Sequence, residues 1–358
     1  MSRIRKLIEK LKEKDLDFAL IFPGANFRYL TGATIETYER FCTLIIDLKN
    51  EDATVVVPKL DELKIKGKGI NYFAYTDNEN PLDYLKRIIQ GSSLKVGTEE
   101  NMPIKYYLIL KKFAKEIEIS VIDDVVREMR VIKDEEELAN ISKAVRIIED
   151  SIKETEDKIK EGITENELAS YIYQEILKRN ANPMNLLIQF AENSAIPHWR
   201  HSSKSIKRGD IIVIDVSATY NEYFGDLTRT YSLGNPNYNE FFKIYEIVKE
   251  AHDEAILASK DGILASDLDE IARSVITKKG YGNYFIHRTG HGLGLEVHEE
   301  PFINGLYKKE LKKGMVFTIE PGIYLPGKFG VRLESNVYID SNGKAVSLDS
   351  YWPSPILS

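Results

Sequence analysis

The sequence predicts an α/β protein with two domains, a small one over residues 1–125 and a larger one over residues 126–358. A chain of 358 residues is too long for one ordinary compact core. Before residue 125, short β-rich runs alternate with amphipathic segments, whereas capped helices and strands joined by turns follow it. This change of pattern favours a small α/β domain followed by an α+β domain.

Three β-rich runs and two turn signals define the first domain. The turns lie at Pro23-Gly24 and Gly91-Ser92. The predicted strands cover residues 18–22, 42–46 and 54–57.

Capping signals mark the helices of the second domain. Asp134 and Glu137 form a capping box before a helix with one apolar face, and Thr164 and Glu167 form another before a helix that ends near residue 178. A third helical region runs from residue 250 to 259, and we expect it to continue past Asp267. Predicted strands cover residues 211–215, 223–232, 315–320 and 331–339.

Composition and charge exclude several classes of protein. The chain has 43% hydrophobic and 29% charged residues, as soluble folded proteins do, and its net charge of -7 argues against binding to nucleic acid or an anionic membrane. The single cysteine, Cys42, cannot form an internal disulfide, and no apolar run follows the basic N-terminus. We therefore expect a cytoplasmic protein.

The histidines are distributed unevenly. All six lie in the second domain, and His291 and His298 stand seven residues apart in the segment GHGLGLEVHE. His252, within a helical run, is interpreted as a surface or core residue without a functional role. For His201 and His287 the residues leave the choice between structure and function open.

Four acidic residues lie at or near strand ends, where a buried charge is costly unless a positive group compensates it: Asp215, Asp226, Glu320 and Glu334. Taken singly, Asp226 could be a turn residue, and Glu334 could pair with Arg332 on the same strand face. Four carboxylates and one histidine exceed the usual ligand set of one ion and indicate two bridged divalent ions. The oxygen-rich set favours Mn²⁺ or Co²⁺, with Fe²⁺ or Zn²⁺ as alternatives.

Motifs in a fixed order carry a resemblance to a known family. The sequence resembles the Xaa-Pro peptidases, which are the prolidases and aminopeptidases P of the pita-bread, creatinase-like metallopeptidases. Residues 26–32 and 129–133 resemble the start of their creatinase-like N-terminal domain and the junction before their catalytic domain. The motifs of the second domain lie at residues 214–215, 225–230, 290–294 with 297–299, 318–322 and 330–334.

The resemblance implies a metal-binding role for five residues. Asp215, Asp226, His291, Glu320 and Glu334 match the ligands of two metal ions, and those matching Asp226 and Glu334 bridge the ions.

The resemblance also implies catalytic and substrate-binding roles. Glu320 would transfer a proton from the attacking water, while His198 and His298 would lie close to the substrate. His298 is not expected to bind metal, and a seven-residue separation in an extended segment would point it away from His291.

The sequence departs from the family pattern at two positions. Ser335 stands where many members have an acidic residue, so a hydrogen bond next to the metal ligands is weaker or replaced. Phe302 stands where many prolidases have an arginine that meets the substrate carboxylate, and Arg332 or Arg288 could replace it.

The predicted activity is hydrolysis of the bond between an N-terminal residue and proline. A prolidase acting on dipeptides is favoured over an aminopeptidase P acting on longer peptides, chiefly because the chain is compact. A methionine aminopeptidase normally lacks the first 125 residues, and creatinase or a non-catalytic binding module would have lost ligands that are all present here. From the resemblance we expect a homodimer.

Overall fold

The computed structural model describes residues 2–114 and 116–358, and the chain forms two compact units, residues 1–130 and 131–358. The predicted boundary at residue 125 lies within the last helix of the first unit, α6 (Asp123–Arg130). Each unit has its own apolar core.

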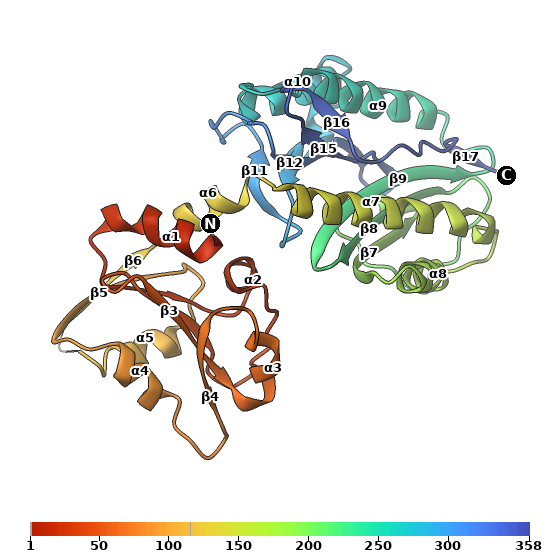
Figure 1. The fold of residues 1–358 in the computed structure, drawn as a ribbon. Helices are drawn as coiled ribbons and strands as arrows, with labels where there is room; N and C mark the ends of the chain where they lie inside the picture. Colours follow the sequence, from red (N-terminus) through yellow and green to blue (C-terminus); the bar gives the residue numbers. More distant parts are fainter. Residues whose placement is uncertain (1, 115) are drawn as a thin grey trace. The chain divides into compact units, whose positions relative to one another are not determined.

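A six-stranded mixed sheet forms the first unit, with strand order β4-β3-β2-β1-β5-β6 (Figure 1). The predicted runs become the three strands β1, β2 and β3, which pair antiparallel, whereas β4, β5 and β6 join by parallel pairing. The strands are β1 (Phe18–Ile21), β2 (Thr43–Asp47), β3 (Asp52–Pro58), β4 (Asn71–Tyr75), β5 (Ser93–Thr98) and β6 (Glu116–Val121). The helices besides α6 are α1 (Arg3–Leu11), α2 (Ala25–Thr31), α3 (Glu62–Ile65), α4 (Leu82–Ile88) and α5 (Ile104–Leu110).

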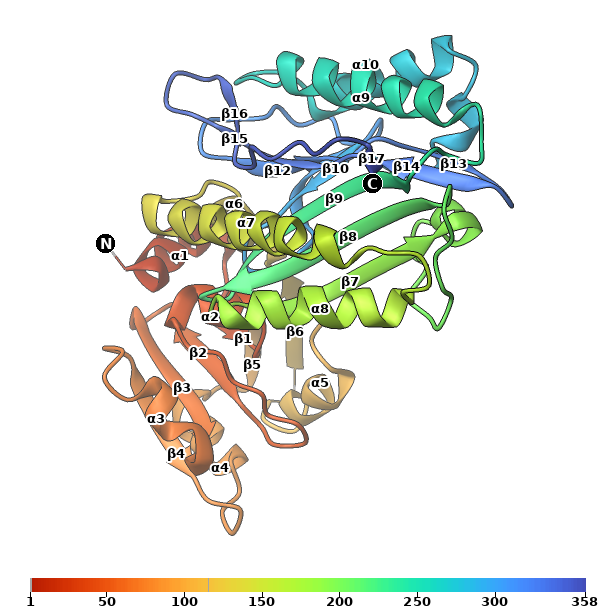
Figure 2. The same cartoon turned by 90° about the vertical axis from the view of Figure 1, so that its right-hand side faces the viewer.

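Helices cover both sides of the sheets in the second unit (Figure 2). Helices α7 (Glu135–Thr155) and α8 (Glu165–Lys178) lie on one side, and α9 (Phe241–Ala258) and α10 (Ala265–Lys278) lie on the other. One sheet has the order β17-β9-β8-β7, a second the order β11-β10-β12-β15-β16, and β13 pairs with β14. These strands are β7 (Asn182–Phe190), β8 (Ile211–Tyr220), β9 (Tyr223–Leu233), β10 (Gly290–Gly292), β11 (Glu299–Ile303), β12 (Val316–Ile319), β13 (Gly322–Leu325), β14 (Phe329–Arg332), β15 (Ser335–Ile339), β16 (Ala345–Ser347) and β17 (Ile356–Leu357).

A hairpin joins the two predicted strands that carry Asp215 and Asp226. Strands β8 and β9 pair antiparallel from Ile211↔Ser232 to Tyr220↔Tyr223. Asn221 and Glu222 connect them with φ angles of 48° and 72°, the left-handed conformation of a two-residue hairpin turn. This register sets Asp226 opposite Ser217 and Asp215 opposite Thr228.

The prediction of one continuous strand over residues 331–339 is wrong, because the chain leaves one sheet and enters another within this range. Strand β14 pairs with β13, whereas β15 pairs with β12. Leu333 and Glu334 form the irregular step between them. Glu334 therefore lies at a junction of two sheets and not on the face of one strand.

The prediction that the third helix of this domain continues past Asp267 is also wrong. Helix α9 ends at Ala258, and Gly262 then adopts a φ of 86°, a conformation that only glycine takes without strain. A separate helix, α10, starts at Ala265.

Both predicted capping boxes are present in the structure, before α7 and α8. Among the described residues, no helix combines the length and the apolar character that crossing a membrane requires.

A single buried carboxylate fixes the segment that follows β7. Glu165, at the start of α8, is fully buried and accepts hydrogen bonds from the backbone N–H groups of Phe190 (2.8 Å) and Ser202 (2.8 Å). It also accepts from the side chains of Asn193 (2.8 Å) and Trp199 (3.3 Å). These bonds tie down both ends of the segment that carries His198.

Glu99 is a buried acid of the first unit, and no cation among the described residues forms a hydrogen bond with it. Its carboxylate accepts from the backbone N–H of Phe22 and from the Asn26 side chain, both at 2.8 Å. Burial raises the pKa of Glu99 to about 7, because desolvation outweighs these hydrogen bonds.

This raised pKa makes the stability of the protein depend on pH. The folded protein keeps a proton on Glu99 that the unfolded chain loses near its ordinary pKa of 4.5, so the stabilisation is complete below that pH and is lost as the pH rises through about 7. The shift corresponds to roughly 3 kcal/mol. We predict that Glu99→Gln keeps its stability above pH 7, so that its Tm rises relative to wild type between pH 5 and pH 8 in calorimetry. Glu118→Gln, at an exposed position of β6, is the control. An equal Tm difference at both pH values would contradict the prediction.

Candidate metal centre

The second unit contains a pocket of about 580 Å³ that gathers most of the predicted site residues. Its walls come from β7, β8, β9, β10 and the segments next to β12 and β14. The predicted residues that line it are His198, Asp215, Asp226, His291, His298, Glu320, Arg332 and Glu334.

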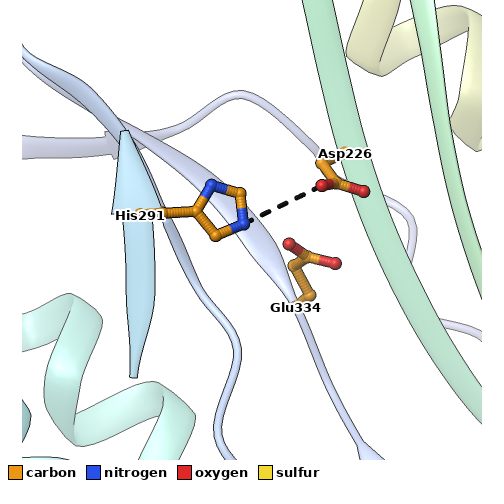
Figure 3. Close-up of side chains that lie close together, drawn as sticks. All are labelled: Asp226, His291 and Glu334. Atoms are coloured by element: carbon orange, nitrogen blue, oxygen red, sulfur yellow. Dashed lines mark ion pairs between the residues drawn. The ribbon is translucent and has the colours of Figure 1, made fainter. Parts of the chain in front are cut away.

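Three of these residues form a compact group, shown in Figure 3. One ligand atom each from Asp226, His291 and Glu334 lies within 4.8 Å of the others, and the three residues are 7%, 2% and 2% exposed. Asp226 comes from β9, His291 from β10, and Glu334 from the step between β14 and β15. The change of sheet at Glu334 thus brings this carboxylate to the histidine.

Close backbone approach explains the glycines around His291. A Cβ atom at Gly290 would lie 1.9 Å from the carbonyl oxygen of Thr318, and one at Gly292 would lie 2.2 Å from that of Glu300. Only glycine allows β10 to pass this close to its neighbours. The Thr318 hydroxyl also accepts a hydrogen bond from the His291 backbone N–H (3.1 Å).

Glu320 and Asp215 lie at the edge of this group. A carboxylate oxygen of Glu320 is 3.3 Å from Nε2 of His291, whose distance to Asp226 is 3.9 Å. Asp215 lines the same pocket, but its carboxylate accepts a short hydrogen bond from Arg332. Arg332 pairs with Asp215 and makes no ion pair with Glu334 among the described residues, so the alternative explanation of Glu334 is wrong.

The electrostatics of the group favour a cation. Burial, and then the neighbouring carboxylates, raise the pKa of Asp226 and of Glu334 far above the ordinary range. Burial also opposes the ionisation of Glu320, but the hydrogen bond from His291 and the charges of His291, His287 and Arg332 together outweigh burial and lower the pKa of Glu320. All these acids ionise together at neutral pH only if positive charge is added between them, and their oxygen and imidazole donors fit divalent ions.

The expectation that His298 points away from His291 is wrong. The segment between them bends back, because β10 and β11 pair antiparallel, and the two imidazole rings contact edge to face with centroids 4.2 Å apart. Partial burial against the pocket wall, together with His291, lowers the pKa of His298 to about 4. His298 is therefore a neutral imidazole in the pocket lining. His198 lines the same pocket with an exposed side chain.

The remaining histidines differ in environment. His287, which the sequence left open, lines the pocket and lies 2.8 Å from the hydroxyl of Tyr324. That hydroxyl accepts from Arg332 (2.7 Å), so His287 and Tyr324 extend the polar wall; the location of His287 four residues before His291 was the only sequence signal. His201 is exposed and contacts the carbonyl of Leu186 outside this pocket.

Comparison with known proteins assigns the family. Residues 139–341 match the model of metallopeptidase family M24, and residues 3–132 match that of the creatinase/prolidase N-terminal domain. The chain belongs to metallopeptidase family M24. The predicted resemblance, the two-part fold and the assignment as a peptidase are confirmed.

Relatives of this M24 peptidase cover almost its whole length. It is 37% identical over 346 residues to a Xaa-Pro dipeptidase of Pyrococcus horikoshii, with 96% of this chain and 95% of the relative aligned. The crystal structure of a prolidase from Thermococcus sibiricus matches with a TM-score of 0.91 and 38% identity, covering 99% of this chain and 98% of the other. An X-Pro aminopeptidase from Thermotoga maritima matches with a TM-score of 0.87 and 32% identity, covering 99% of both chains.

A second buried network supports Glu334 in this M24 peptidase. Arg229 donates to the Glu334 carbonyl oxygen (2.7 Å) and forms an ion pair with Asp349 (2.9 Å). Asp349 accepts from the Ser335 hydroxyl at 2.9 Å, and that hydroxyl lies 3.0 Å from Nε2 of His252. The acid missing at position 335 is thus replaced by Asp349, and His252 is a buried structural residue, as predicted.

Removing Asp349 should destabilise the M24 fold, because the guanidinium of Arg229 would stay buried without its carboxylate. The two side chains are 1% and 0% exposed. We predict that Asp349→Ala lowers the free energy of unfolding by about 3–5 kcal/mol in urea denaturation. Glu310→Ala, which removes an exposed carboxylate, should change it by less than about 0.5 kcal/mol. Equal effects of the two changes would show that the ion pair does not support the fold.

Proposed function

We propose that this M24 peptidase hydrolyses the peptide bond between an N-terminal residue and proline, with dipeptides as substrates. The observation that carries the proposal is the buried group Asp226, His291 and Glu334, which opens into the same pocket as Glu320 and His298. Relatives named Xaa-Pro dipeptidase and prolidase support the substrate class. The relative named X-Pro aminopeptidase and the absence of an arginine at Phe302 support the alternative, action on longer Xaa-Pro peptides.

Two divalent ions, Mn²⁺ or Co²⁺ in preference to Fe²⁺ or Zn²⁺, are the proposed cofactors. Their proposed ligands are Asp215, Asp226, His291, Glu320 and Glu334, with Asp226 and Glu334 shared. Bound there, the ions would lower the pKa of water enough to supply hydroxide at neutral pH. For Asp215 to act as a ligand, one of its oxygens must remain available beside the bond from Arg332.

The side chains of the pocket would carry out the remaining steps. Glu320 accepts the proton of the attacking water and passes it to the proline nitrogen as the C–N bond breaks. His298 and His198 line the pocket, where their ring N–H groups would donate hydrogen bonds to the oxygen of the scissile carbonyl as it gains charge. The proline nitrogen carries no N–H, so the pocket has to accommodate its ring. We further propose that the protein is a homodimer in the cytoplasm. The role of Arg332 in substrate binding stays a prediction.

Metal-dependent hydrolysis tests this function. The protein is stripped with a chelator, reloaded with Mn²⁺ or Co²⁺, and assayed on Leu-Pro, Leu-Pro-Gly and Leu-Ala. We expect activity only after reloading, with Leu-Pro cleaved fastest and Leu-Ala not cleaved. In the Asp226→Asn variant, reloading with metal should not restore hydrolysis. Faster cleavage of Leu-Pro-Gly would instead assign an aminopeptidase P, and cleavage of Leu-Ala alone would disprove the Xaa-Pro specificity.

Replacing Glu320 tests the proton transfer. A glutamine keeps the size and one oxygen of the side chain but cannot accept a proton, so we predict that Glu320→Gln lowers kcat by roughly 10²–10⁴-fold. The assay uses saturating metal, and the metal content is measured by mass spectrometry to separate catalysis from metal loss. Near-normal turnover in the metal-loaded variant would disprove the role of Glu320.

A further inference from the structure

Three arginines line the pocket, and they differ in exposure and in their contacts with other side chains. Arg332 is 3% exposed, and its guanidinium donates to Asp215, to the Tyr324 hydroxyl (2.7 Å) and to the Thr228 hydroxyl (3.2 Å). It is therefore held inside the wall by groups of the protein. Arg200, in contrast, is an exposed side chain after His198.

Arg288 differs from Arg332 in its contacts and from Arg200 in being partly buried. Within the described parts of the chain, its guanidinium makes no hydrogen bond and no ion pair. It lies over the ring of Phe302, with 5.0 Å between the guanidinium carbon and the ring centroid. This contact holds the charged group in place but leaves the N–H donors at its edge unused. Partial burial lowers the pKa of Arg288, which shows that the pocket wall desolvates the charge.

The location of this guanidinium relates it to the reacting groups. Phe302 lies directly opposite His291 in the pairing of β10 and β11, so the ring beneath Arg288 belongs to the strand next to the candidate ligand. The charge of Arg288 also acts on Glu320 and on His298. Arg288 therefore adjoins the part of the pocket where the proposed chemistry takes place.

We infer that Arg288, positioned by Phe302, binds the free C-terminal carboxylate of the substrate and so selects dipeptides. The inference deepens the proposed function and rests on it. In an Xaa-Pro dipeptide the carboxylate is bonded to the proline Cα, which is bonded to the scissile nitrogen, so its binding group must lie next to the reacting groups. A guanidinium binds such a carboxylate through two parallel hydrogen bonds. A longer peptide offers one neutral carbonyl oxygen there and loses this pair.

The test compares Leu-Pro with Leu-Pro-amide, which differs only in the missing carboxylate charge. For the metal-loaded wild type we expect a ratio of kcat/KM values, Leu-Pro over Leu-Pro-amide, of at least 10. Arg288→Gln should lower this ratio at least tenfold, mainly through a higher KM for Leu-Pro. Arg288→Lys should give an intermediate ratio, because an ammonium is a point charge without the planar fork.

A binding measurement and a control make the test independent of turnover. N-Acetylproline carries the proline carboxylate but has no amino-terminal residue to be released, so it serves as an inhibitor. Its inhibition constant should rise at least tenfold in Arg288→Gln. Arg200→Gln is the matched control and should keep the wild-type substrate ratio. Thermal unfolding and metal content, measured for each variant, establish that the fold and the metal centre are intact.

The outcomes separate the two proposals. If wild type cleaves Leu-Pro and Arg288→Gln keeps the ratio and the inhibition constant, the role of Arg288 is wrong and the Xaa-Pro activity stands. Loss of the ratio in Arg200→Gln, with no loss in Arg288→Gln, would assign the carboxylate to Arg200 and likewise overturn the inference. If metal-loaded wild type cleaves neither Leu-Pro nor its amide, the proposed function fails and the inference fails with it.

Discussion

The burial of several carboxylates in one pocket is the constraint on which the second unit depends. Desolvation opposes the negative charge of Asp226 and of Glu334, and the charges of neighbouring carboxylates raise both pKa values further. The buried guanidinium of Arg332 is already paired with Asp215. A divalent cation would offset the repulsion, so ligand binding and folding stability are coupled in this unit.

Neutral donors from neighbouring strands keep the acids in place despite this repulsion. The hydroxyl of Thr228 donates to Glu334 (2.7 Å) and accepts from Arg332 (3.2 Å), so one side chain of β9 links the two ends of the step between β14 and β15. The backbone N–H of Glu334 also donates to the carbonyl oxygen of Thr228 (3.2 Å). The position of Glu334 is thus set by its contacts with β9, not by a regular strand of its own.

Local signals in the sequence were sufficient to predict part of this arrangement. The capping boxes at Asp134 and Thr164 were predictable because a cap joins residues three positions apart. The break at Glu334 was not, because alternation continues through residues 331–339 and the change of sheet depends on pairing with distant strands. The contact of His291 with His298 escaped prediction for the same reason, since a bend in the chain replaces the expected extended segment.

The two departures from the family pattern have different physical consequences. At position 335 a carboxylate from a distant residue, Asp349, completes a buried ion pair, so its stabilisation is present as soon as the chain folds. At position 302 an aromatic ring holds the guanidinium of Arg288, which makes no hydrogen bond or ion pair among the described residues. The first replacement contributes to the rigidity of the site. The second leaves a desolvated charge to be compensated, which is the condition under which a bound carboxylate adds affinity.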